Sequence, residues 1–130
     1  MEAIGTRKPS VLLADDDEDL LLLMKMKMKA EGFSVQVSYN GDHIYEMVES
    51  YHPDIILLDI TMRGINGGDI CKHLKTDKKT RDIPVVLFSA NDNIKTIAKE
   101  CGANDCLDKP FNNLLMKKKL LDVLGKQTSN

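Results

Sequence analysis

Side chains that could carry out chemistry follow four short apolar segments of this chain. They comprise carboxylates, one hydroxyl and one amine, namely Asp15 and Asp16, Asp59, Ser89 and Lys109. Each of these residues is ordinary at the end of a strand when taken alone. Together they are the groups that a hard divalent cation and a phosphoryl-transfer reaction require.

Carboxylates gathered in one crevice need a positive partner. At ~4 Å and an effective dielectric near 20, two of them repel by about 4 kcal/mol before screening. Lys109 supplies one positive charge, and a divalent cation would supply two. Because the expected ligands are oxygen atoms, the expected metal is Mg²⁺ or Mn²⁺, held by Asp15 and Asp16. The acids that follow, Asp17 to Asp19, are expected to cap the next helix and to interact with its dipole.

A metal beside a carboxylate, a hydroxyl and an ammonium can support phosphoryl transfer. In this interpretation Asp59 is the nucleophile and forms an acyl phosphate. The metal, Lys109 and Ser89 would each contact one phosphoryl oxygen and neutralise the charge that develops there.

The positions of these residues depend on alternating strands and helices. The apolar runs predict strands at Val11–Ala14, Phe33–Ser38, Ile55–Leu58 and Val85–Phe88 and around Cys106-Leu107. Segments with helical spacing lie at Asp17–Glu31, Gly41–Tyr51, Gly67–Lys75, Ile94–Cys101 and Asn112–Leu124. This alternation predicts a doubly wound α/β sandwich with a parallel sheet, in which ligands bind at the carboxyl ends of the strands.

One segment conflicts with the helical pattern, because the alternating methionines and lysines of residues 24–29 have the period of a strand. We predict a helix there, since Met, Lys and Leu are good helix formers and Gly32 is a natural stop. The expected core face of this helix is Leu20, Leu23, Met24 and Met28. For the second helix the expected face includes Tyr51, and for the last helix it is Leu114, Leu115, Leu121 and Leu124.

The composition argues against several classes of protein. The 130 residues suit a single domain, with an expected core at about 8–124 and a short loose N-terminus and C-terminal tail. A formal net charge of -2 without a basic stripe predicts no binding of nucleic acid. With no apolar run long enough for a signal peptide or a membrane span, we expect a cytoplasmic protein that does not bind membranes. The three cysteines lack metal-site spacing and are expected to be core residues.

At these positions the sequence resembles the receiver domain of bacterial two-component response regulators, and in particular its stand-alone chemotaxis regulators. The resemblance extends from about Lys8 to Leu124. It rests on the Asp15-Asp16 pair, Pro53 to Asp59 with Met62 and Gly67, Ser89-Ala90, Gly102-Ala103 and Lys109-Pro110-Phe111. It implies a flavodoxin-like (βα)₅ fold with the strand order 2-1-3-4-5.

The resemblance also implies a role for each site residue. Asp59 would accept a phosphoryl group from a sensor histidine kinase or a histidine phosphotransfer protein. The implied Mg²⁺ ligands are Asp15, Asp16, Asp59 and the backbone carbonyl of Thr61. Ser89 would move towards the phosphate, Lys109 would pair with it, and the Lys109-Pro110 bond would be cis. Such a protein is a phosphorelay signalling protein rather than an enzyme, and it acts through a partner protein or passes the phosphate onward.

Two residues depart from the family pattern. Arg63 stands where many receivers have proline, and Cys106 stands where an aromatic residue is usual. The familiar coupling, in which a ring swings into space vacated by the hydroxyl, therefore cannot operate in its usual form. These departures affect the expected output and leave the expected phosphorylation chemistry unchanged.

Two other classes share some of these features. A haloacid-dehalogenase-like phosphatase also uses a strand-end aspartate and Mg²⁺, but it typically has a second acid where this chain has Thr61. A receiver-fold binding module that is never phosphorylated, or one that binds flavin, is the other alternative. The full set of acids, hydroxyl and lysine argues against a binding module that is never phosphorylated. The lack of a Ser/Thr/Gly phosphate loop after the first strand argues against flavin binding.

Overall fold

The computed structural model describes residues 8–62, 65–90, 92–109 and 112–128 of the chain. Its strands are β1 Ser10–Ala14, β2 Ser34–Ser38, β3 Ile55–Asp59, β4 Thr61–Met62, β5 Ile65–Asn66, β6 Val85–Ser89 and β7 Asp105–Asp108. Its α-helices are α2 Glu18–Ala30, α3 Ile44–Tyr51, α4 Gly67–Thr76, α5 Ile94–Cys101 and α6 Asn113–Thr128. A 3₁₀ turn, Gly41–His43, leads into α3.

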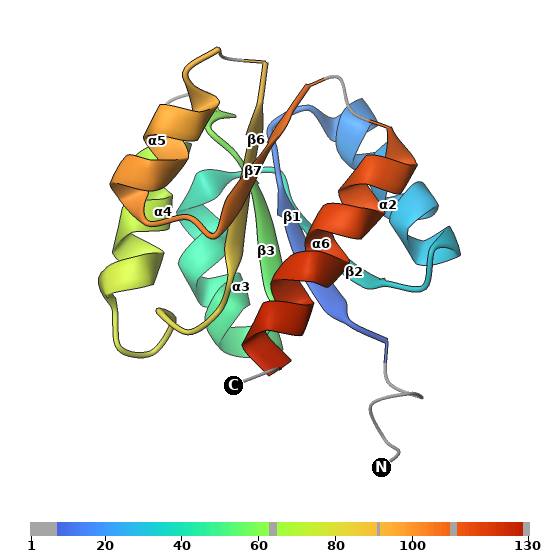
Figure 1. Cartoon of the computed structure of the whole chain (residues 1–130), viewed down its shortest axis with the longest axis horizontal. Coiled ribbons are helices and arrows are strands. Elements are labelled where there is room, and N and C mark those ends of the chain that lie inside the picture. Colours follow the sequence, from blue (N-terminus) through green and yellow to red (C-terminus); the bar gives the residue numbers. More distant parts are fainter. Residues whose placement is uncertain (1–7, 63–64, 91, 110–111, 129–130) are drawn as a thin grey trace.

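The main sheet has five parallel strands in the order β2-β1-β3-β6-β7. Counting only these strands along the chain, the order is 2-1-3-4-5, as predicted. Helices α3, α4 and α5 cover one face of the sheet, and α2 and α6 cover the other (Figure 1). The order reverses between β1 and β3, so the carboxyl ends of these two neighbours border the crevice where doubly wound folds bind ligands.

Both faces of the sheet are buried, which explains why its strands are apolar throughout. Along β1, Leu12 and Ala14 pack with the three-helix side, while Val11 and Leu13 pack with α2 and α6. The other central strands alternate in the same way, and all residues of β3 and β6 are buried. Parallel strands covered on both sides require this composition.

The segment with alternating methionine and lysine is a helix, as predicted. Asp17 caps α2 by accepting a hydrogen bond from the backbone N–H of Leu20 at 3.1 Å. The predicted core face was partly wrong, because Leu21 is fully buried whereas Leu23 is 48% exposed. With leucine at four consecutive positions, hydrophobicity alone could not indicate which of them faced the sheet.

The predicted core face of the last helix was also largely wrong, although Leu124 is partly buried and packs against the core. Within residues 113–125 of α6, the buried side chains are Met116, Leu120 and Val123, at i, i+4 and i+7. The predicted residues Leu114, Leu115 and Leu121 are exposed. Tyr51 on α3 is 52% exposed and likewise lies outside the core. In α6, several leucines lie on the outer side of the helix, so the stripe chosen by leucine count was rotated away from the sheet.

A short antiparallel pair, β4 with β5, follows β3 and was not predicted. It returns the chain to Gly67 at the start of α4, where the Gly67 N–H donates to the carbonyl oxygen of Ile60 at 3.1 Å. A Cβ on Gly67 would lie 2.5 Å from the Ile60 Cα and closer still to the Asp59 carbonyl oxygen. The absence of a side chain at this position therefore allows α4 to pack against the end of β3.

This close approach predicts that Gly67→Ala lowers the free energy of unfolding by about 1–3 kcal/mol, because backbone atoms have to move. Denaturant unfolding would measure the change. Gly125→Ala in α6 is the matched control, since nothing lies within 4 Å of its Cβ position and alanine favours helices. A Gly67 variant as stable as the control would show that the β3–α4 contact is easily relaxed.

The three cysteines are buried and free, as expected for core residues. Among the residues that the structure describes, none of the helices is both long and apolar enough to cross a bilayer.

Candidate functional site

The carboxyl edge of the sheet brings the acidic residues together. Asp15 follows β1 and Asp59 ends β3, and these strands are hydrogen-bonded neighbours with Ala14 opposite Leu58. Asp15 is 1% exposed, Asp59 is 4% exposed, and Asp16 is half-buried. Two carboxylates therefore lie almost out of contact with solvent at the end of an apolar sheet.

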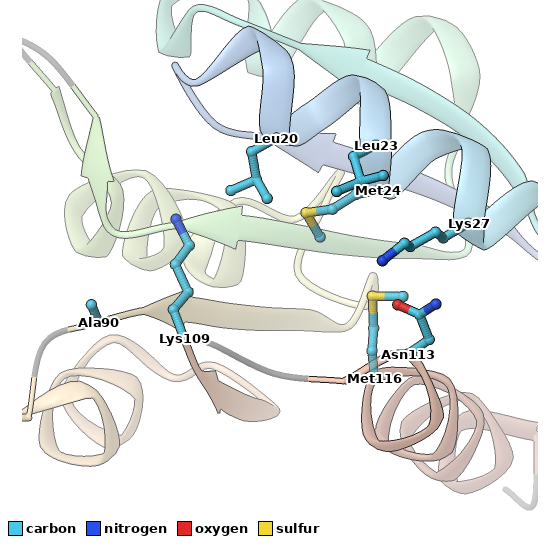
Figure 2. Close-up of a pocket in the computed structure, with 8 residues that line it drawn as sticks. All are labelled: Leu20, Leu23, Met24, Lys27, Ala90, Lys109, Asn113 and Met116. Atoms are coloured by element: carbon cyan, nitrogen blue, oxygen red, sulfur yellow. The ribbon is translucent and has the colours of Figure 1, made fainter.

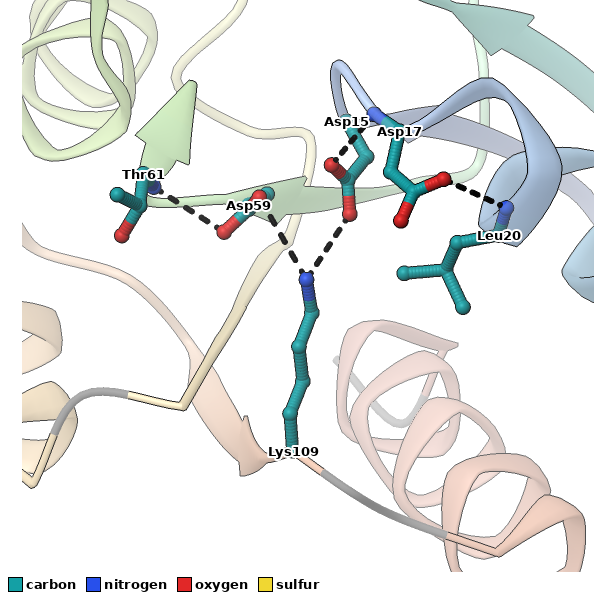
Figure 3. A network of polar contacts seen from close by, with 6 residues as sticks. All are labelled: Asp15, Asp17, Leu20, Asp59, Thr61 and Lys109. Atoms are coloured by element: carbon teal, nitrogen blue, oxygen red, sulfur yellow. Dashed lines mark hydrogen bonds and ion pairs between the residues drawn. The ribbon is translucent and has the colours of Figure 1, made fainter. Parts of the chain in front are cut away.

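Lys109 reaches this pair from the end of β7 (Figure 3). Its Nζ lies 3.0 Å from Asp15 Oδ2 and 3.6 Å from Asp59 Oδ2. Its ammonium also lies 4.7 Å from the centre of the Phe88 ring, a cation–π contact. A single ammonium thus lies beside two buried carboxylates, and Lys109 is 94 residues from Asp15 in the sequence.

The acids have more negative charge than Lys109 neutralises. Oxygens of Asp15, Asp16 and Asp59 lie within 4.8 Å of one another, a grouping that could hold a metal ion. Three carboxylates and no sulfur or imidazole ligand form a donor set that suits a hard divalent cation. The residues present therefore fit the cation expected from the sequence.

Asp59 carries the clearest electrostatic signature in the site. Burial, aided by the negative charge of Asp15, raises the pKa of Asp59 from 3.8 to about 6. The backbone N–H of Thr61, which donates to Asp59 Oδ1 at 3.1 Å, and the ammonium of Lys109 act in the opposite direction on this pKa. A second positive charge next to Asp59 would favour the ionised, nucleophilic form.

The other predicted site residues lie close by. Ser89 ends β6, is buried, and its carbonyl oxygen accepts a hydrogen bond from the Lys109 backbone N–H at 2.8 Å. Thr61 lies two residues beyond Asp59, with its N–H directed at that carboxylate. The sequence prediction did not include the contact between Phe88 and Lys109. The only available signal was the position of this aromatic residue one place before Ser89.

Of the two residues that depart from the family pattern, Cys106 lies within the described residues and Arg63 does not. Cys106 lies on β7, is 9% exposed, and belongs to the core cluster on the side of α3, α4 and α5. Lys119 of α6 donates to the carbonyl oxygen of Cys106 at 2.7 Å, which ties this helix to the edge strand. Arg63 and Pro110 lie outside the described residues, and so does the predicted cis bond.

The raised pKa of Asp59 predicts a pH dependence of stability in metal-free protein. Between pH 3.8 and about 6 the folded carboxyl keeps its proton, whereas the unfolded one has lost it. The contribution of Asp59 to the free energy of unfolding therefore falls as pH rises through that window. The Asp59→Asn variant lacks this cost, so at pH 7.5 it should exceed the wild type in free energy of unfolding by roughly 2 kcal/mol. Urea titrations of both proteins at several pH values would measure the difference. A gap that stays constant from pH 4 to 8 would contradict the assignment.

The fold and site together define a class, a flavodoxin-like α/β domain with an acidic site at the point where the strand order reverses. Residues 11–121 match the model of the response regulator receiver domain. The chain is also 38% identical over 110 residues to the response regulator PleD of Caulobacter vibrioides, a match that covers 82% of this chain and 24% of PleD. The chain thus belongs to the response regulator receiver family.

Solved structures agree on the fold. A putative response regulator from Chloroflexus aurantiacus superposes with a TM-score of 0.86 at 23% identity, covering 92% of this chain and 99% of that one. The chemotaxis protein CheY4 of Vibrio cholerae gives a TM-score of 0.82 at 22% identity, covering 90% and 99%. Receiver domains are phosphoacceptor signalling domains that pair with histidine kinases. The chain spans about a quarter of the length of PleD, the curated relative that it matches.

Proposed function

We propose that this chain accepts a phosphoryl group on Asp59 in a Mg²⁺-dependent reaction. The donor would be a phosphohistidine of a sensor histidine kinase or of a histidine phosphotransfer protein. The phosphorylated domain then signals through a partner protein or passes the phosphate to another histidine. The observation that supports this most is the meeting of three carboxylates and one lysine at the carboxyl edge of β1, β3 and β7.

In this proposal an oxygen of Asp59 attacks phosphorus while the bond to the donor's imidazole nitrogen breaks. The donor's imidazole leaves with a proton on its other ring nitrogen, so the products are an acyl phosphate on Asp59 and a neutral histidine on the donor. Lys109, already within 3.6 Å of Asp59, would pair with a phosphoryl oxygen, and the Ser89 hydroxyl would contact another. Asp15, Asp16, Asp59 and the Thr61 carbonyl would hold Mg²⁺, which supplies charge neutralisation when bound.

The experiment that tests this proposal is intact-mass spectrometry after incubation with acetyl phosphate and Mg²⁺. We expect one phosphoryl adduct per chain, formed only when Mg²⁺ is present. A chelator in place of Mg²⁺ is the control for the metal. Absence of an adduct under all these conditions would instead support the binding module that is not phosphorylated.

The same experiment separates the phosphatase alternative. A haloacid-dehalogenase-like enzyme would consume the small phosphate ester repeatedly without accumulating an adduct. Here the side chain two residues after Asp59 is the exposed Thr61, which cannot act as a general acid in the way that a carboxyl can. We therefore expect stoichiometric labelling with at most slow hydrolysis, as measured by phosphate release.

A further inference from the structure

A second concave feature lies between helices α2 and α6, beside the acidic site (Figure 2). It is a pocket of about 420 Å³, which falls in the size range of small-molecule sites. The apolar side chains that line it are Leu20, Leu23 and Met24 from α2, Met116 from α6, and Ala90, which follows β6. Lys109 also lines the pocket, and its ammonium contacts Asp15 and Asp59, so this end is nearest to the acids.

The apolar part of this pocket has a buried floor and an open rim. Met24 is 5% exposed and Met116 is 1% exposed, whereas Leu23 at the rim is 48% exposed. Thioether side chains are flexible and polarisable, and they adapt to ligands of different shapes. These surroundings suit the apolar body of a ligand.

One end of the pocket is polar. Lys27 of α2 and Asn113 of α6 extend towards one another there (Figure 2). Within the described part of the chain, neither side chain has an ion pair or a hydrogen bond. Lys109 at the opposite end is different, because it is already engaged by Asp15 and Asp59. The available charge is therefore a single positive group at the end distant from the acids.

From this arrangement we propose that the pocket binds a small amphipathic carboxylate of the medium-chain fatty acid class. Its carboxylate would accept hydrogen bonds from the Lys27 ammonium and the Asn113 amide. Its apolar chain would run between Met24 and Met116 towards the stem of Lys109. Charge complementarity selects an anion over a cation, and the apolar walls select a chain over a free inorganic ion.

Titration of the metal-free protein with octanoate tests this proposal by calorimetry and by backbone amide chemical shifts. We expect saturable binding at one site, with shifts grouped in residues 20–27 and 113–116. Octylammonium, which has the opposite charge, and acetate, which has no chain, should not saturate the site at the same concentrations. Lys27 is exposed, so Lys27→Met should weaken octanoate binding roughly threefold to fivefold, the loss of a solvent-screened charge pair. The matched control is Lys29→Met, which removes the same charge from a likewise exposed position on the same helix that does not line the pocket, and it should leave binding unchanged.

Three results would overturn the proposal. They are a failure of octanoate to saturate the wild type, equal binding of octylammonium, and unchanged affinity in Lys27→Met. If a histidine phosphotransfer protein shifts these amides and octanoate does not, the pocket is part of a protein interface and the proposal is wrong.

Discussion

Replacing Asp59 by asparagine is expected to reduce phosphoryl labelling by acetyl phosphate at least ~100-fold, because the amide oxygen is a poor nucleophile. The variant also removes one of the three carboxylates grouped for the metal. Its fold should be retained, since the amide oxygen of the new side chain can still accept the hydrogen bond from the Thr61 N–H and the buried charge is gone. Intact-mass spectrometry of wild type and variant, labelled in parallel, measures the effect.

Asp54→Asn is the matched control for this loss. Asp54 precedes β3 at the opposite end of the same strand, and its carboxylate accepts a hydrogen bond from the Ser10 N–H at 2.8 Å. Labelling of this variant should equal that of the wild type. If Asp59→Asn keeps its adduct, the acceptor is another residue, and peptide mapping of Asp15 and Asp16 would follow.

Replacing Lys109 by methionine should lower the free energy of unfolding of the metal-free protein by about 2–3 kcal/mol at pH 7.5. Removing one partner of a buried ion pair leaves an uncompensated charge, which typically costs more than the pair contributed. The value lies at the low end of the usual range, because Lys109 is 24% exposed. Methionine keeps an apolar stem beside Phe88, so the variant isolates the charge.

The effects of pH and of Mg²⁺ on this loss of stability identify its cause. Lys109 lowers the pKa of Asp59, so its removal should raise that pKa further, and the defect should shrink as pH falls and Asp59 takes up a proton. Mg²⁺ at millimolar concentration should restore most of the stability, because the proposed site of three carboxylates exists only in the folded chain. Urea unfolding at pH 5 and pH 7.5, with and without Mg²⁺, would measure both.

Lys117→Met is the control for the loss of a lysine. Lys117 lies 2.9 Å from Glu31, but both side chains are more than a third exposed, so the loss should not exceed about 1 kcal/mol. If the loss of stability in Lys109→Met depended on neither pH nor Mg²⁺, packing rather than charge would explain the role of Lys109.

Much of the fold could be predicted from the sequence because its signals are local. Continuous, β-branched-rich runs such as residues 55–58 are typical of parallel strands that are covered on both faces. Good helix formers with a cap at Asp17 outweighed the strand-like period of the methionines and lysines. Acids placed directly after two of those strands were enough to predict a shared crevice.

Other features were decided by tertiary packing. Four consecutive leucines in α2 and the scattered leucines of α6 are equivalent by hydrophobicity, so only the position of each helix on the sheet determined that Leu21 and Leu120 are buried. The exposure of Leu23 in turn created a wall of the pocket.

In the site, too, some features could be predicted from the sequence and others depend on tertiary packing. Residue types predicted that Asp15, Asp59 and Lys109 would meet, because strand ends of a parallel sheet share one edge. The raised pKa of Asp59 and the contact of Lys109 with Phe88 depend on burial and distance between segments far apart in the chain. Such quantities arise only when the strands are assembled, since desolvation is a property of the surroundings of a residue and not of the residue.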